Sequence, residues 1–170
     1  MSSNMYKKLL GVGLGSALAL SGAYLVSPYE GLVNKTYVDP VGILTVCYGT
    51  TGYKAIKGKI YTDDECLEQL ASGLVEHDKE MMKAISVPIT DFQHAAFLSF
   101  TYNVGVTNFK RSSMLVKLNK GDYIGACKEL PKWVYAKGKV LQGLVKRRQS
   151  EMKMCLGELD EINKQLAKTP

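Results

Sequence analysis

The chain has 170 residues, 46% of them hydrophobic, which is enough for the core of one ordinary domain or of two small lobes. Its formal net charge of +6 and pI of about 9.0 favour an anionic partner such as lipid headgroups, nucleic acid or an acidic cell wall. We do not expect nucleic acid, because the sequence contains no Cys/His finger and its basic residues are scattered, with only Lys146-Arg147-Arg148 clustered. That triplet is equally consistent with a solvated helix face. No cluster of metal ligands is visible, so we expect no metal and no other cofactor.

The first element is an uncharged run from Leu9 to Tyr29, preceded by Lys7 and Lys8. At 1.5 Å per residue, about 20 helical residues match the thickness of a hydrocarbon core. The two lysines should stay in the cytoplasm, so the rest of the chain would be exported. We therefore predict a membrane segment over residues 1–29 that ends one residue before Glu30.

This run is only weakly apolar, because it is rich in small residues: Gly11, Gly13, Gly15, Ser16, Ala17, Ala19, Ser21, Gly22 and Ala23. Glycine and serine gain almost nothing on insertion, and glycine also weakens a helix. We expect a weakly hydrophobic helix that the export machinery recognises and that later leaves the bilayer. Two other interpretations stay open: a signal peptide cleaved at Ala17-Leu18-Ala19 or Ser21-Gly22-Ala23, and a permanent anchor that packs through its small residues.

A β-rich segment is predicted over about residues 30–61. Its β-branched and aromatic residues are interrupted by Asp39-Pro40, Gly42 and Gly49, a pattern typical of short antiparallel strands joined by tight turns. A capping box of Thr62 and Glu65 then begins a long helix, predicted over about residues 62–86.

The rest of the chain is predicted to be a helical lobe over about residues 88–157, followed by a charged tail, 158–170. The expected helices are one capped by Thr90 and ended at Gly105, one capped by Ser112 or Ser113 and running through Leu118, one capped by Asp122 and ended by Pro131, and one from about Leu141 to Leu156 with Gly157 after it. A loop with Trp133, Tyr135 and Gly138 lies before the last of these. The fold class is therefore α+β, with a ligand cleft expected between the two lobes.

Four cysteines, Cys47, Cys66, Cys127 and Cys155, contain no CxxC pair, so a zinc or thioredoxin-type site is not expected. An exported domain meets an oxidising compartment, where disulfides form. Of the three possible pairings, chain order favours Cys47–Cys66 and Cys127–Cys155, each of which closes a local loop. The alternative is that some of these cysteines stay buried and free.

Glu30, Asp39 and Thr45 are the candidate catalytic residues. Inverting glycoside hydrolysis needs a protonated acid and a second carboxylate that activates water. Glu30 and Asp39 can face each other across a cleft, and the Thr45 hydroxyl can hold the water with Asp39. Spacing alone is weak evidence, because turn chemistry also explains an aspartate before a proline. His77 and His94 are single helical histidines with no nucleophile motif nearby.

The chain resembles the phage-type lysozymes, the muramidases of tailed phages. Eight residues separate Glu30 from Asp39 and five separate Asp39 from Thr45, as in the catalytic triad of that family. Further similar blocks are residues 29–31 and 45–49 in the opening hairpin, 100–105, 108–109 and 118–122 in the helical lobe, and Gly143, Leu144, Arg147, Arg148 and Glu151 in the last helix. The resemblance covers about residues 29–157, and several ordered blocks together are highly specific.

The resemblance implies a lysozyme-like bilobed fold, with residues 30–170 forming the catalytic domain. It implies a monomeric endolysin that cleaves the β-1,4 bond between N-acetylmuramic acid and N-acetylglucosamine of peptidoglycan. Glu30 would be the general acid, while Asp39 and Thr45 would position and activate the water. Tyr48, Asn103 and Asn108 are expected to bind substrate.

The weak N-terminal segment is similar to that of the signal-arrest-release endolysins of lambdoid phages. Such enzymes are exported by the host Sec machinery, held inactive in the inner membrane with the catalytic domain in the periplasm, and activated on release. Because Leu9–Tyr29 contains no cysteine, activation by disulfide exchange within the segment is excluded. Two alternatives stay open: a membrane-anchored wall-binding protein without catalysis, and a lytic transglycosylase, against which Asp39 and Thr45 argue because it activates no water.

Overall fold

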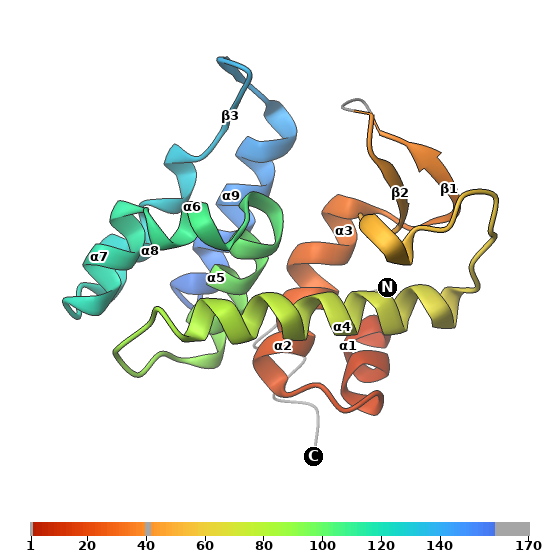
Figure 1. Cartoon of the computed structure of the whole chain (residues 1–170). Coiled ribbons are helices and arrows are strands. Elements are labelled where there is room, and N and C mark those ends of the chain that lie inside the picture. Colours follow the sequence, from red (N-terminus) through yellow and green to blue (C-terminus); the bar gives the residue numbers. More distant parts are fainter. Residues whose placement is uncertain (1, 40–41, 159–170) are drawn as a thin grey trace.

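In the computed structural model, which describes residues 2–39 and 42–158, the long helix α4 (Asp63–Met82) joins a small β-sheet lobe to a helical lobe (Figure 1). Its predicted capping box is confirmed, since Thr62 and Glu65 each accept a hydrogen bond from the other's backbone N–H. The helix ends at Met82 and not near residue 86. A turn in which Ala84 N–H bonds to the Met81 carbonyl at 3.0 Å replaces the predicted last helical turn.

The small lobe is built on one antiparallel hairpin. Strand β1 (Val33–Val38) pairs with β2 (Leu44–Cys47), and Tyr37 lies opposite Thr45. The 3₁₀ turn η2 (Gly52–Lys54) follows. The predicted antiparallel strands are therefore confirmed, and the hairpin turn begins at Asp39, whereas Pro40 of the predicted turn lies outside the described residues.

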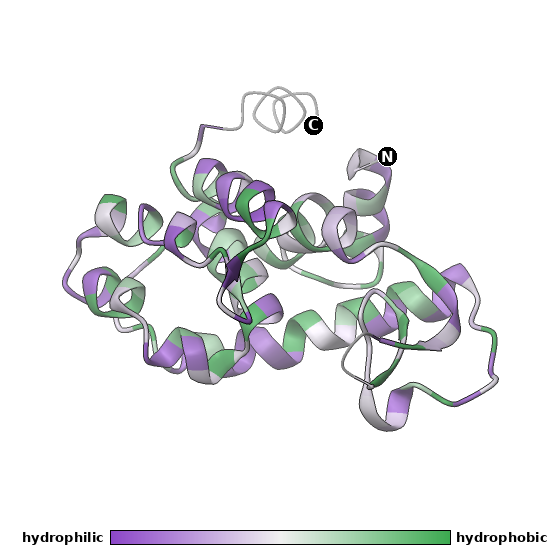
Figure 2. Cartoon of the chain, turned by 90° about the horizontal axis from the view of Figure 1, so that it is seen from above, coloured by the Kyte–Doolittle hydropathy of each residue, from purple (hydrophilic) through white to green (hydrophobic). Residues whose placement is uncertain are grey.

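The helical lobe surrounds one buried helix. Its elements are α5 (Asp91–Val104), α6 (Val106–Lys110), α7 (Ser113–Asn119), α8 (Tyr123–Cys127), the 3₁₀ turn η3 (Leu130–Lys132), strands β3 (Tyr135–Ala136) and β4 (Lys139–Val140), and α9 (Gln142–Cys155). Residues 95–101 of α5 are all buried. Figure 2 shows hydrophobic and hydrophilic residues alternating along the helices, as expected where one face packs inward.

The predicted caps of this lobe are confirmed, but one predicted helix end is wrong. The side chains of Thr90, Ser112 and Asp122 each accept a backbone N–H at a helix start. The helix capped by Asp122 ends at Cys127, and Pro131 lies in the separate turn η3, where proline fits a first-turn position. The expected loop that follows contains the short hairpin of β3 and β4, and helix α6 was not predicted from the sequence.

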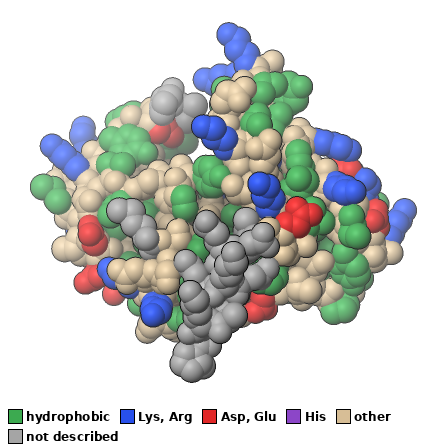
Figure 3. All heavy atoms as spheres, turned by 180° about the vertical axis from the view of Figure 1, so that it is seen from behind, with side chains coloured by type: hydrophobic (Ala, Val, Ile, Leu, Met, Phe, Trp, Pro, Cys, Tyr) green, Lys and Arg blue, Asp and Glu red, His purple; other side chains and the backbone are tan. Residues whose placement is uncertain are grey.

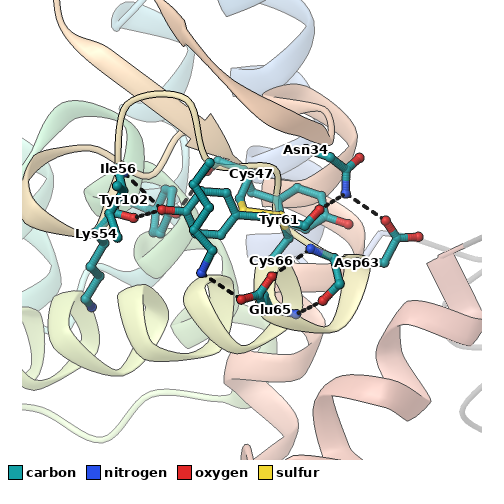
Figure 4. The surroundings of a disulfide bond; sticks show 12 residues. Asn34, Cys47, Lys54, Ile56, Tyr61, Asp63, Glu65, Cys66 and Tyr102 are labelled. Carbon is teal, nitrogen blue, oxygen red and sulfur yellow. Dashed lines mark hydrogen bonds and ion pairs between the residues drawn. A yellow bond between two sulfur atoms is a disulfide. The ribbon is translucent and has the colours of Figure 1, made fainter.

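Both disulfides favoured by chain order, Cys47–Cys66 and Cys127–Cys155, are present, so none of the four cysteines is free. The first joins the end of β2 to the first turn of α4 (Figure 4). The second joins α8 to the end of α9. Each lobe is thus closed by one covalent link.

The N-terminal segment is not the single long helix expected from the sequence. It forms α1 (Ser2–Gly11), α2 (Ser16–Leu20), the π-helix η1 (Ser21–Val26) and α3 (Ser27–Glu30). The break between α1 and α2 contains Gly13 with φ of 91°, a backbone conformation that favours glycine. Over the parts of the chain that the structure describes, no helix combines the length and apolarity needed to cross a bilayer.

This segment packs into the protein core. Eight of its apolar residues are buried: Leu9, Leu14, Ala17, Ala19, Leu20, Ala23, Leu25 and Val26. A Cβ added to Gly22 would lie 2.6 Å from a methyl carbon of Leu9 and 2.8 Å from one of Leu74, so α4 and α1 approach η1 closely here. In this structure residues 2–30 therefore belong to the same packed unit as the helical lobe. The predicted boundary at residue 29 remains a prediction about the membrane-tethered state.

Candidate active site

Helix α3 carries Glu30 at its C-terminal end. The Tyr29 hydroxyl lies 2.7 Å from Ser150 Oγ and donates to the Lys146 carbonyl at 3.1 Å, so both of its contacts are on α9. Gly31, with φ of 71°, ends the helix and leads the chain into β1. The glutamate is thus held between the helical lobe and the start of the sheet.

The Glu30 carboxylate has one cationic partner and one close backbone neighbour. Arg147 Nη1 donates to its Oε1 at 2.6 Å, and the Glu30 side chain is 23% exposed. A Cβ on Gly49, whose φ is 80°, would lie 3.1 Å from Glu30 Oε2. Glycine is needed at this position both for its conformation and for the space that the carboxylate occupies.

Asp39 and Thr45 are held at the hairpin turn by the same residue. Ile43 N–H donates to Asp39 Oδ1 at 2.8 Å, and the Thr45 hydroxyl donates to the Ile43 carbonyl at 3.0 Å. The Thr45 side chain is buried while Asp39 is half-buried. Strand β2 carries Thr45 and joins the turn with Asp39 to Gly49, which lies against Glu30. It therefore connects the Asp39–Thr45 pair to the surroundings of Glu30.

A cavity of about 280 Å³ lies between the lobes; Gly49, which lies against Glu30, is part of its lining, whereas Glu30, Asp39 and Thr45 are not. Among its lining residues are Gly49 and Lys54 from the small lobe, His77 from α4 and Tyr102 from α5. The Tyr102 hydroxyl donates to the Tyr48 carbonyl at 3.1 Å. Burial, with a smaller contribution from the charge of Glu30, raises the pKa of Tyr102 to about 12, so this hydroxyl stays protonated. The cleft expected between the lobes is therefore present.

The three predicted substrate-binding residues have different environments. Tyr48 is buried, whereas Asn103 and Asn108 are exposed. The side-chain oxygen Oδ1 of Asn103 accepts a hydrogen bond from Arg148, and the side-chain Nδ2 of Asn108 donates to the backbone carbonyl of Val104 at 2.7 Å. Substrate binding by these residues stays a prediction, and for Tyr48 burial argues against direct contact in this state.

Sequence reasoning missed the arginines of this site. The triplet from Lys146 to Arg148 was equally consistent with a solvated helix face, but Arg147 and Arg148 are 4% and 0% exposed. The available signal was Glu151, which lies four residues after one arginine and three after the other, on the same helical face. Figure 3 shows other basic side chains spread over the face in view, not gathered into one patch.

Both histidines have partners other than a metal ion. His77 Nδ1 lies 2.8 Å from the Gly73 carbonyl, and its ring packs against Tyr102 with centroids 5.0 Å apart. His94 pairs with Asp78. No group of three or more histidine, cysteine or acidic residues within residues 2–39 and 42–158 could hold a metal ion.

Comparisons with known proteins show which proteins the chain is similar to. A family model described as phage lysozyme matches residues 27–151. A SAR-endolysin of Bacteriophage PS119 is 39% identical over 161 residues, which cover 92% of this chain and 96% of the relative. The muramidase domain of SpmX from Asticaccaulis excentricus is 28% identical, with a TM-score of 0.74 over 80% of this chain and 95% of that domain. The active form of P1 phage endolysin Lyz shares the fold, with a TM-score of 0.82 over 95% of this chain and 97% of that one at 22% identity.

Proposed function

Because this chain belongs to the phage lysozyme family and is therefore a glycoside hydrolase, we propose that it cleaves the β-1,4 bond between N-acetylmuramic acid and N-acetylglucosamine of bacterial peptidoglycan. As an endolysin it acts at the end of the phage cycle to lyse the host cell. The basic chain, with a net charge of +6, suits an anionic wall polymer.

The general acid in this proposal is Glu30. The observation that carries it is the position of this carboxylate: it is part-exposed, lies against Gly49 in the lining of the cavity between the lobes, and is held by Arg147 at 2.6 Å. A general acid needs a fixed geometry toward the leaving-group oxygen, within about 3 Å. The contacts of Tyr29 and the ion pair of Glu30 with Arg147 supply that geometry, both from α9.

Asp39 and Thr45 are proposed to hold and activate the attacking water. Both are tied to the backbone of Ile43, which fixes a carboxylate and a hydroxyl at one turn. An acid on one side of the bond and an activated water on the other invert the anomeric centre, with carboxyl groups about 6.5–9.5 Å apart. We expect NMR of the first-formed product to show the inverted anomer, and retention would contradict this assignment.

Release from the membrane is proposed as the activating step. The chain would be exported by the host Sec machinery with residues 1–29 inserted in the inner membrane, and the enzyme would act in the periplasm after that segment leaves the bilayer. The packed N-terminal segment supports this, because eight of its apolar side chains are buried in the protein and so cannot face lipid at the same time. Glu30 ends this same segment, so its position depends on where the segment lies.

The test is peptidoglycan hydrolysis by the purified full chain and by Glu30→Gln. Glutamine keeps the shape but cannot donate the proton, so turnover should fall about 10²–10⁴-fold while circular dichroism stays native. Near-normal turnover would contradict the mechanism. The Asp39→Asn variant separates hydrolysis from a transglycosylase reaction, because only hydrolysis needs an activated water. If the enzyme is a hydrolase, this variant should lose activity.

A further inference from the structure

The buried carboxylate of Glu151 is not used by the mechanism above, yet it is one contact away from the acid. Glu151 is 0% exposed and lies on α9, one helical turn after Arg147. Burying a charge is costly unless it is paired and hydrogen-bonded. A fully buried carboxylate directly behind the partner of Glu30 therefore needs an explanation.

The contacts of Glu151 use both of its oxygens. Oε1 accepts the Ser99 hydroxyl at 2.7 Å and Arg147 Nε at 3.2 Å, while Oε2 accepts Arg148 Nη1 at 2.7 Å. The carboxylate is thus held from α5 and α9 at once. It holds the Arg147 guanidinium at Nε, whereas Nη1 of the same group contacts Glu30.

Arg147 has one remaining charged contact, and this contact is with the acid. Its Nη1 donates to Glu30 at 2.6 Å, its Nη2 donates to the Ser99 carbonyl at 3.4 Å, and its guanidinium lies 5.7 Å from the Tyr29 ring centre. A guanidinium presents its donors in one rigid plane, so fixing Nε also sets the direction of Nη1. Glu151 is therefore placed to aim Arg147 at Glu30.

The charges of this group also matter. Around Arg147 lie Glu30 and Tyr29 from α3, Glu151 and Arg148 from α9, and Ser99 and Tyr102 from α5. Burial raises the pKa of Glu151, but two arginines and the Ser99 hydroxyl contact its oxygens and favour its charged form. With Glu30 also ionised, the two carboxylates balance the two arginines. Without the charge of Glu151, both arginines would favour the ionised form of Glu30, which cannot donate a proton.

We propose that Glu151 is a positioning residue for the reaction. It orients Arg147, so that Glu30 points at the glycosidic oxygen, and it partly neutralises the positive charge of Arg147, so that Glu30 can still carry its proton. The inference rests on the proposed role of Glu30 as general acid. It also assigns a role to Arg148, whose Nη2 donates to Asn103 and whose guanidinium lies 4.9 Å from the Phe100 ring centre, as the second cation that holds Glu151 in place.

The decisive measurement is the pH dependence of kcat/KM for Glu151→Gln, with purified soluble full-length enzyme on peptidoglycan. The basic limb of this profile reports ionisation of the essential acid of the free enzyme. We expect the limb to move to lower pH by about 0.5–1 unit, because an uncompensated positive charge favours the anion. We also expect kcat to fall about tenfold or more, a part of what general acid catalysis contributes.

A matched control exists in the same lobe. Glu129 is also buried and is also held by two cations and a serine, Lys117, Lys132 and Ser113, but none of the contacts found for it is with Glu30. Glu129→Gln should lose stability as Glu151→Gln does, while its basic limb stays where it is in the wild type. An unmoved limb in Glu151→Gln would overturn the proposal and leave Glu151 with a structural role only.

A second variant decides the case if Glu151→Gln does not fold. Glu151→Asp keeps the charge but shortens the reach, so we expect an unmoved limb with kcat reduced several-fold; unchanged kcat would overturn the proposal. Glu30→Gln is measured in the same assay. If that variant is active, the proposed acid is wrong, and this result is separate from any result at Glu151.

Discussion

Glu129 shows at the scale of one residue how a buried carboxylate ties stability to pH. It is 3% exposed and contacts Lys117, Lys132 and Ser113, which lower the pKa of Glu129 to about 2. Its unfolded value is about 4.3. Since the folded pKa is the lower one, the stabilisation is present above about pH 4.3 and is lost as pH falls toward 2.

We therefore expect the wild type to lose roughly 1–3 kcal/mol of unfolding free energy from this group between about pH 5 and pH 2, a range that allows for solvent screening of the two exposed lysines. Urea denaturation at several pH values measures this loss. Glu129→Gln should show a correspondingly flatter dependence. Equal slopes for both proteins would mean that Glu129 is not responsible for the acid sensitivity.

The N-terminal segment provides the prediction at the scale of an element, through its glycines. A Cβ on Gly22 would meet Leu9 and Leu74 at under 3 Å, whereas a Cβ on Gly15, whose φ is −68°, has nothing within 4 Å. Both changes to alanine alter hydropathy equally. Overpacking a core costs about 1–3 kcal/mol, while an open surface change costs within about 0.5 kcal/mol.

Gly22→Ala should therefore lower the melting temperature of the soluble enzyme and increase the fraction of protein that stays in the membrane. Gly15→Ala should do neither. Thermal unfolding and membrane fractionation of both variants measure these effects. If both variants behave alike, hydropathy and not packing controls release.

The elements that could be predicted from sequence are those with local signals. Capping residues such as Thr62, Thr90 and Ser112 mark helix starts locally, because each side chain accepts a hydrogen bond from a backbone N–H in the first turn of its own helix. Spacing and resemblance also gave the positions of Glu30, Asp39 and Thr45. Their catalytic roles stay proposals.

The parts that could not be predicted depend on distant partners. Arg147 is buried because Glu30, 117 residues away, and Glu151 satisfy its guanidinium, and the sequence shows only a basic triplet. The breaks in the N-terminal segment follow from packing against α4 and α5. The weak apolarity of that segment is compatible with a membrane or with a protein interior. Its packing into the protein interior is visible only in the folded structure.

For the whole molecule, the N-terminal segment supplies part of the packed core, and in the proposed release model it also directs export. Loss of residues 2–23 would remove Leu9, Leu14 and Leu20 from that core. We therefore expect the soluble periplasmic enzyme to keep its uncleaved N-terminus, as intact-mass spectrometry would show. A mass starting near Ser21 or Tyr24 would mean signal-peptidase cleavage and would contradict the release model.

A trapping variant completes this test. Gly11 and Gly15 are open in the packed structure, so leucine at both should leave the soluble fold intact while adding apolarity to the membrane segment. Gly13 is left unchanged because its φ of 91° disfavours a side chain. The double variant should remain membrane-bound and inactive in cell fractionation, and normal release would contradict the proposed marginal insertion.

The π-helix Ser21–Val26 has a consequence for angle as well as for packing. A π-turn takes up one residue more than an α-turn, which rotates everything after it by about 100° around the helix axis. A lipid environment favours an uninterrupted α-helix, because every backbone group must bond within the segment. In a tethered chain with that register, Glu30 would leave the segment at a different angle from the one it has in this structure. The extra residue in the π-turn would then distinguish two orientations of the chain after residue 26, one in the bilayer and one in the packed enzyme.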